Sequence, residues 1–314
     1  MKRFFAKLIV FVLIFWGVSY LISRMLDSKF RQDRSTKEAW TLSQHNRSFS
    51  YAVAGSSRAF NHIDVGTLQE RTGRSAINIA YGGQNIIDVY VTLHLFLAHE
   101  NQIGTLLLQL DGSDLNNSRE FMSRLYVPYA NDSEVARVER EVLGWKRYLV
   151  MKVCPLAKYW EYNNIYSWAE LQNARSGVSK YDDTGGSELL FDESYHDFPT
   201  NPGDPELVLD TRSCEYLDRI VDLARSRGIN LLFFTAPAYH PNTFKKYDEA
   251  TRTYITRYCE TRGIPYLDFS KASFSQSEFR DHSHLNGRGA LRFTAMLADS
   301  INQRTSTLLS ERSR

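Results

Sequence analysis

The fold is decided by one run of residues, Gly104-Thr105-Leu106-Leu107-Leu108-Gln109-Leu110-Asp111. The run is apolar over nearly its whole length and lies between a glycine and an aspartate. This pattern is typical of a strand that is buried on both faces of a parallel sheet. It therefore predicts the interior of a sheet that is covered on both sides.

Strands and helices alternate before and after this run. Further strands are predicted at residues 51–54, 77–80, 230–235 and 265–269. Apolar residues at helical spacing predict helices at residues 86–99, 216–227, 244–261 and 289–303. Alternation on this scale predicts an α/β fold, with a parallel sheet between two layers of helices.

The alternation stops over residues 116–209. This segment contains a helix-like stretch at 134–150, many tyrosines and tryptophans, and a loop at 181–205 that is rich in Asp, Gly, Ser and Pro. We interpret the segment as an insertion that caps the functional site or contacts the substrate.

The N-terminus predicts a membrane anchor. Basic residues precede an apolar run at 8–22, which with its flanks is about 20 residues long and can cross a bilayer. Trp16 and Tyr20 lie toward its far end, where amphipathic rings often meet the membrane interface. No Ala-x-Ala cleavage site follows the run, which favours an uncleaved signal anchor at residues 1–23.

A polar, charged segment follows the anchor. Residues 24–48 show little apolar periodicity and predict a tether to a domain at residues 49–310. Basic residues on this side of the anchor oppose the positive-inside rule, namely Arg24, Lys29, Arg31 and Arg34. A long C-terminal domain can nevertheless be translocated despite such charges.

Composition excludes one class of partner. With 38 Lys and Arg against 36 Asp and Glu, the net charge is +2, and basic residues do not gather outside the N-terminal flank. Nucleic-acid binding is therefore not expected. The cysteines, Cys154, Cys214 and Cys259, form no Cys-x-x-Cys metal pair. One disulfide and three buried thiols both stay open for them.

Two distant segments carry the residue types of a Ser-His-Asp site. One reads Gly55-Ser56-Ser57-Arg58 and follows a predicted strand, so that a serine hydroxyl projects from the strand end. The other reads Asp281-His282-Ser283-His284-Leu285-Asn286 and opens a helix. The spacing lets His284 turn one ring nitrogen to Asp281 and the other to a serine from elsewhere. A helix cap and a structural histidine would each explain one segment, but together the segments indicate acyl chemistry.

Gly55-Ser56-Ser57 resembles the first sequence block of the SGNH/GDSL hydrolase superfamily, and Asp281-x-x-His284-Leu285-Asn286 resembles its last block. The resemblance covers residues 51 to about 300. It implies a three-layer αβα, flavodoxin-like fold, with Ser57 as the nucleophile. Ser56 replaces the usual Asp of Gly-Asp-Ser, a departure shared with membrane-anchored branches that act on cell-envelope polymers.

The oxyanion of an acyl-transfer intermediate needs hydrogen-bond donors. We expect the backbone N–H of Ser57 to be one donor and the turn at Gly83 another, because glycine lets the backbone approach closely. The resemblance implies a third donor from an Asn in a Gly-x-Asn-Asp block. The sequence has Ser113 at that place, and Ser113 is the predicted substitute, with Asn85 and Asn78 as alternatives.

Two further residues are predicted to contact the substrate. Arg58 follows the nucleophile and can pair with an anionic group, although a solvated arginine on the first turn of a helix is the more ordinary outcome. His240 follows a predicted strand and is a second candidate, for which a loop histidine without a role is an equally ordinary outcome. No metal or cofactor is expected.

Three functions fit these residues. The first is an O-acyltransferase or esterase that acts on an extracytoplasmic polysaccharide or other glycan. The second is an anchored lipase or thioesterase-like hydrolase, and the third is a non-catalytic scaffold that binds glycans. Resemblance to the anchored proteins of alginate acetylation and teichoic-acid D-alanylation favours the first. It also implies a multispanning membrane acyltransferase as partner.

Overall fold

The computed structural model of the chain describes residues 1–116, 121–160, 172–174, 177–191, 195, 206–239 and 245–312. The chain forms two compact units. We call residues 1–43 with 121–179 the helical unit, and residues 44–120 with 180–314 the sheet unit.

The sheet unit contains a five-stranded parallel sheet in the order β2-β1-β3-β4-β5. The strands are β1 (Ser48–Ala54), β2 (Ala76–Asn78), β3 (Gln102–Gln109), β4 (Asn230–Thr235) and β5 (Tyr266–Asp268). β3 is the middle strand, as the leucine run predicts, and pairs Leu106 with Ala52 on β1 and with Leu231 on β4. This strand order is that of flavodoxin-like folds, in which ligands bind where the order reverses, between β1 and β3.

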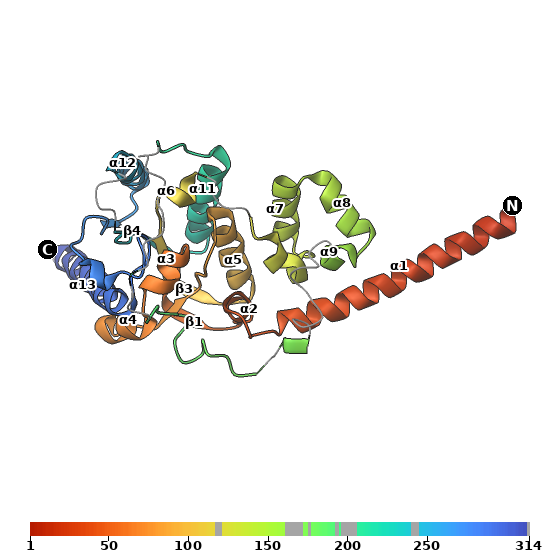
Figure 1. The fold of residues 1–314 in the computed structure, drawn as a ribbon, viewed down its shortest axis with the longest axis horizontal. Coiled ribbons are helices and arrows are strands. Elements are labelled where there is room, and N and C mark those ends of the chain that lie inside the picture. Colours follow the sequence, from red (N-terminus) through yellow and green to blue (C-terminus); the bar gives the residue numbers. More distant parts are fainter. Residues whose placement is uncertain are drawn as a thin grey trace. The chain divides into compact units, whose positions relative to one another are not determined.

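Helices cover both faces of the sheet (Figure 1). They are α3 (Ser57–His62), α4 (Val65–Thr72) and α13 (Gly287–Arg312) on one face, and α5 (Ile86–Ala98), α11 (Thr211–Ser226) and α12 (Lys245–Arg262) on the other. Alternation along β4 sets the two layers, because Phe234 packs in one cluster with Phe293 of α13, whereas Phe233 stacks on Tyr258 of α12 at 6.3 Å. The predicted three-layer α/β fold is confirmed.

Most of the predicted helices and strands begin and end within several residues of the observed bounds. The short helices α3 and α4, which fill the segment after β1, were not predicted. One turn of helix, α6 (Gly112–Leu115), follows β3, and the 3₁₀ turn η2 (Gln276–Glu278) precedes the 281–286 loop.

The helical unit is built from α1 (Lys2–Arg31), α2 (Lys37–Leu42), the 3₁₀ helix η1 (Ser123–Tyr129), α7 (Ser133–Leu143), α8 (Trp145–Val153) and α9 (Ala157–Trp160). The stretch predicted as one helix at 134–150 is two helices. Gly144 separates them with a φ of +88°, in the region that favours glycine. In the described part of the chain, α1 is the one helix long and apolar enough to cross a membrane.

The segment predicted as a tether is largely helical. α1 continues to Arg31, and its buried Asp27 accepts a hydrogen bond from Lys158 Nζ at 2.6 Å and another from the Tyr159 hydroxyl. Trp40 of α2 is also buried, with the Lys37 ammonium 4.4 Å from its ring centroid. Polar residues of this segment therefore lie at contacts within the helical unit rather than in a solvated tether.

Candidate active site

Three residues from the two predicted segments meet at the carboxyl ends of the strands. Ser57 Oγ lies 2.9 Å from His284 Nε2. His284 Nδ1 lies 3.0 Å from each oxygen of the Asp281 carboxylate. When Nδ1 carries the ring proton toward Asp281, Nε2 presents a lone pair to the serine hydroxyl, which is the arrangement of a general base.

A tight turn between β1 and α3 positions Ser57. Gly55 has a φ of +143°, and a Cβ there would lie 2.8 Å from the Cβ of Gln109. Ser56 is fully buried, and its backbone N–H and hydroxyl donate to Gln109 Oε1 at 3.1 and 2.9 Å. Ser56 thus attaches the turn to the middle strand and leaves Ser57, at the start of α3, to face His284.

The loop of His284 is organised by Asp281. Its Oδ1 accepts from the backbone N–H groups of Ser283 and His284, each at 2.8 Å, and from the Ser283 hydroxyl at 2.9 Å. Asn286 closes the loop as the predicted cap of α13, since its Oδ1 accepts from the N–H of Gly289 at 3.1 Å.

These contacts fix the charge state of Asp281. Burial raises the pKa of its carboxyl group, but the hydrogen bond and charge of His284 and the donors of Ser283 outweigh burial and hold that pKa well below its usual value. Asp281 therefore remains a carboxylate that can orient the imidazole and stabilise its positive charge.

A second histidine, His62, supports the loop from behind. It is fully buried, its Nε2 accepts from the N–H of Leu285 at 3.0 Å, and its ring lies edge-on to that of His284 with centroids 6.1 Å apart. Burial lowers the pKa of His62 well below its usual value, and the charges of Arg58 and His284 lower it further. His62 is therefore a neutral acceptor, which the sequence analysis missed because its partner is 223 residues away.

This histidine gives a pH prediction. Because the folded pKa of His62 is lowered, the unfolded chain binds the extra proton below the ordinary pKa of about 6.5. The stability that neutral His62 contributes is complete above that pH and falls as the pH decreases. We expect His62→Gln, whose amide oxygen can still accept, to weaken the decline of the unfolding free energy between about pH 6.5 and pH 5. Denaturant titrations of both proteins across that pH range measure the unfolding free energy. The same pH dependence in both proteins would contradict the prediction.

Arg58 lines a cavity together with Ser57 and His284, but its guanidinium group is engaged by other protein atoms. Its Nη1 lies 3.0 Å from Asp111 Oδ2, and its Nη2 donates to the carbonyls of Ala236 and Pro237. Both side chains of the ion pair are about nine-tenths buried, with 11% and 10% exposed. Arg58 thus joins the segments that follow β1, β3 and β4, and its contact with a substrate stays a prediction.

The predicted oxyanion donors are Ser113, Gly83 and the backbone N–H of Ser57. Ser113 lines the cavity at Ser57, but both its N–H and its hydroxyl already donate to Asp111 Oδ1, at 2.9 and 2.6 Å. Gly83 adopts the expected glycine turn, with a φ of +80°, but is not among the described residues that line the cavity at Ser57. The backbone N–H of Ser57, in the first turn of α3, is the predicted donor that remains at this cavity.

The two alternative amides are also engaged. Asn78 Nδ2 donates to the carbonyl of Ala59 at 2.9 Å. Asn85 Oδ1 caps α5 by accepting from the N–H groups of Ile87 and Asp88. The amide that does line the cavity is Asn116, whose Nδ2 donates to the Tyr247 hydroxyl at 3.3 Å.

Ser57 and His284 open into a cavity of about 420 Å³, a size typical of small-ligand sites. Hydroxyl, amide and charged groups line it beside them, among them Asn116, Thr235, Tyr247, Asp248, Thr251, Arg252 and Ser270. Several belong to α12, which the sequence did not connect with the site. His282 also lines the cavity, whereas His240 lies outside the described residues.

None of the three cysteines is among the described residues that line this cavity. Cys154, Cys214 and Cys259 are free thiols, and burial raises the pKa of Cys259 to about 12. Over the described ranges, no group of three or more His, Cys, Asp or Glu side chains is placed to hold a metal ion.

No family model matches the chain, and no curated protein matches it. Among solved structures, it is similar to a Bacteroides fragilis protein to which acylhydrolase activity is ascribed, with 12% identity, 83% of this chain and 88% of that chain covered, and a TM-score of 0.36. A protein of the G-D-S-L family from Desulfitobacterium hafniense has 12% identity, coverage of 80% and 99%, and a TM-score of 0.39. A GDSL-like lipase from Bacteroides thetaiotaomicron has 10% identity, coverage of 81% and 89%, and a TM-score of 0.36. At this degree of likeness, the chemistry of the site must come from its own residues.

Proposed function

We propose that the chain is a serine-dependent acyl-ester enzyme of the SGNH/GDSL type. The observation that carries the proposal is the contact of Ser57 Oγ with His284 Nε2 at 2.9 Å, while Asp281 holds the opposite nitrogen of the same ring. A serine hydroxyl is a weak nucleophile unless an adjacent base accepts its proton, and this geometry supplies the base.

The reaction would proceed in two halves. His284 takes the proton of Ser57 as Oγ attacks the ester carbonyl, and the Ser57 N–H faces the developing oxyanion. His284 then returns the proton to the departing alkoxide, which leaves an acyl group on Ser57. In the second half, His284 takes a proton from water or from an acceptor hydroxyl, whose oxygen attacks the acyl-serine. The bond between the acyl group and Ser57 Oγ then breaks, and His284 returns the proton to Oγ.

We place this enzyme in the cell envelope, as an O-acyltransferase or esterase that acts on an extracytoplasmic polysaccharide or other glycan. The apolar helix α1 supports membrane attachment, and the hydroxyl, amide and charged groups of the cavity suit a sugar ring. The acyl donor would be a multispanning membrane acyltransferase, which can meet the anchored enzyme at the same bilayer.

Two measurements on the full-length protein in detergent test the chemistry. We expect slow release of acetate from p-nitrophenyl acetate, and covalent labelling of Ser57 by a serine-directed phosphonate. Acetyl transfer to an added oligosaccharide would identify a transferase, and release to water alone an esterase. The absence of both turnover and labelling would contradict the proposal and favour a binding scaffold.

Topology is tested separately. A reporter that is active only in the cytoplasm, fused after residue 314, is expected to be silent. An active reporter would overturn the extracytoplasmic placement without affecting the proposed chemistry.

A further inference from the structure

The covered face of α1 begins inside its apolar run. Ser19, Ser23 and Asp27 follow one another at intervals of four residues, which places them on one face of the helix. Each is 3% exposed, whereas Leu21 and Met25 are 63% and 72% exposed. The rest of the helical unit therefore packs on α1 from Ser19 onward. Because the apolar run extends to residue 22, that packing begins inside the segment that is long and apolar enough to cross a membrane.

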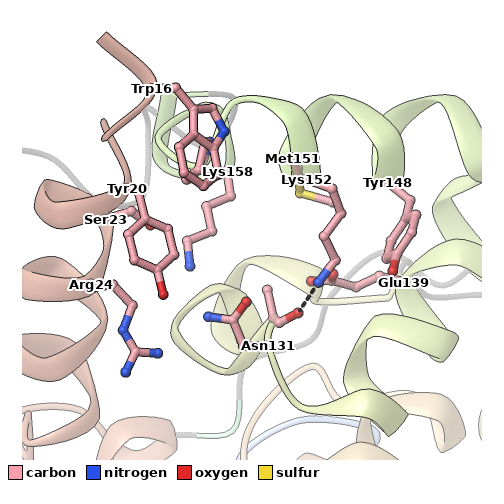
Figure 2. Close-up of a pocket in the computed structure, with 12 residues that line it drawn as sticks. Trp16, Tyr20, Ser23, Arg24, Asn131, Glu139, Tyr148, Met151, Lys152 and Lys158 are labelled. Carbon is pink, nitrogen blue, oxygen red and sulfur yellow. Dashed lines mark hydrogen bonds between the residues drawn. The ribbon is translucent and has the colours of Figure 1, made fainter. Parts of the chain in front are cut away.

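A cavity of about 200 Å³ shows which elements lie at this level (Figure 2). Its wall on α1 includes Trp16, Tyr20, Ser23 and Arg24, and its opposite wall includes Tyr148, Met151, Lys152 and Lys158. The first three residues of the opposite wall belong to α8. α8 therefore lies beside residues 16–24 of α1, at the end of the apolar run, where a bilayer has its headgroup region.

The outer side of α8 is apolar and exposed. Met151 faces inward and is 7% exposed, whereas Trp145, Leu149 and Val153 are 62%, 49% and 62% exposed. These three residues recur every four positions and form one face of the helix. Val150, 53% exposed, widens the face. Large apolar side chains gathered on one exposed helix face mark an interaction site.

The charge of α8 is suited to a lipid surface. The helix reads Trp-Lys-Arg-Tyr-Leu-Val-Met-Lys-Val over 145–153, so it carries three basic residues and no acidic one. Lys146 is exposed, and its long side chain can reach past the apolar face to lipid phosphates, whereas Lys152 lines the inner cavity and donates to the carbonyl of Ala130 at 3.4 Å. Tryptophan and basic residues on one amphipathic helix are typical of helices that lie in the membrane interface.

We propose that α8 is an interfacial helix, which lies on the bilayer that α1 spans. Trp145, Leu149 and Val153 enter the boundary between headgroups and acyl chains, and Lys146 lies near anionic phosphates. The occupant of this face is the bilayer rather than a protein, because the face continues from a membrane-spanning helix of the same unit. The unit then has two attachments to the membrane, which fix its height above the acyl chains.

The test compares two exposed valines of the helical unit in the full chain. Val153 lies on the proposed contact, and Val178, 93% exposed, follows Gly177, whose carbonyl accepts from Arg34 beyond the end of α1. Each valine is replaced by cysteine in a Cys154→Ser, Cys214→Ser background, in which the remaining Cys259 is fully buried. Both proteins are labelled with an NBD dye and reconstituted in phosphatidylcholine vesicles that contain phosphatidylglycerol.

We expect the dye at position 153 to show blue-shifted emission and roughly twofold or stronger quenching by spin-labelled lipid, as for a probe in the interface. The dye at position 178 should behave as in water. Water-like emission from both positions would overturn the proposal, since no other protein is present to cover α8.

Two variants of the Val153→Cys protein separate the apolar contribution to membrane contact from the electrostatic one. Trp145→Ser should reduce the quenching by removing an interfacial anchor. Lys146→Glu should reduce it in vesicles with phosphatidylglycerol and much less in phosphatidylcholine alone. Equal quenching in all three proteins would overturn the contact assigned to α8.

Discussion

Replacement of Ser57 by Ala is expected to lower kcat for an activated acetyl ester by roughly 10⁴-fold or more, to the level left by binding and oxyanion donors alone. The loss is large because the acyl-serine cannot form without Oγ. The fold should be unaffected, because Ser57 is partly exposed and the turn depends on Ser56 and Gly55. Initial rates with the full-length protein in detergent measure it. Ser270→Ala, a second serine of the same cavity, is the matched control and should keep most of the activity.

The partners of Ser57 should behave as one unit with it. His284→Ala is expected to be nearly as damaging, since it removes the base, and Asp281→Asn to be equally or less damaging, since it disturbs the tautomer. Combining either change with Ser57→Ala should add little further loss. A Ser57→Ala protein that retains turnover would exclude the acyl-serine mechanism.

Arg58→Met is expected to reduce the free energy of unfolding by about 3 kcal/mol, because it leaves the buried Asp111 carboxylate without its cation. The matched control is Arg71→Met, which breaks another Arg–Asp pair of the sheet unit. That pair, with Asp299, is 50% and 53% exposed, and we expect less than about 1 kcal/mol there. Chemical denaturation of the three proteins measures the difference.

A second change checks the cause. Adding Asp111→Asn to Arg58→Met should restore part of the lost stability, because the uncompensated charge is removed. If Arg58→Met instead keeps full stability and raises KM for an anionic ester, Arg58 contacts the substrate after all.

The sequence predicted those parts of the fold that depend on local patterns. The leucine run of β3 and the helical spacing of α5 are regular patterns. The hydrogen bond between Asp281 and His284 was also predictable, because the two residues are only three positions apart in one loop. The meeting of Ser57 with His284 followed once both lay after strand ends of one parallel sheet, because such ends share an edge. Their catalytic roles stay predictions.

The partners of Arg58 depend on the arrangement of strands, which no local pattern reveals. The hydrogen bonds from Ser113 to Asp111 could have been predicted, because Asp111-Gly112-Ser113-Asp114 has the pattern of a capping box and forms one at the start of α6. Gln109 was a second signal, since an amide inside a leucine strand must find a polar partner. The four-residue spacing of Ser19, Ser23 and Asp27 was a third, which overall hydropathy concealed.

The pairing of β3 with β4 has a consequence for biosynthesis. Thr105 lies opposite Asn230, so roughly 125 residues must be synthesised before β3 gains its second neighbour, which takes on the order of ten seconds at ordinary translation rates. During that interval the leucine-rich strand can pair with β1 on one side only, and its other edge remains open to strands of other chains. The nascent protein should therefore depend on chaperones at this stage, and ribosome-bound chains that end before β4 should aggregate more readily than those that include it.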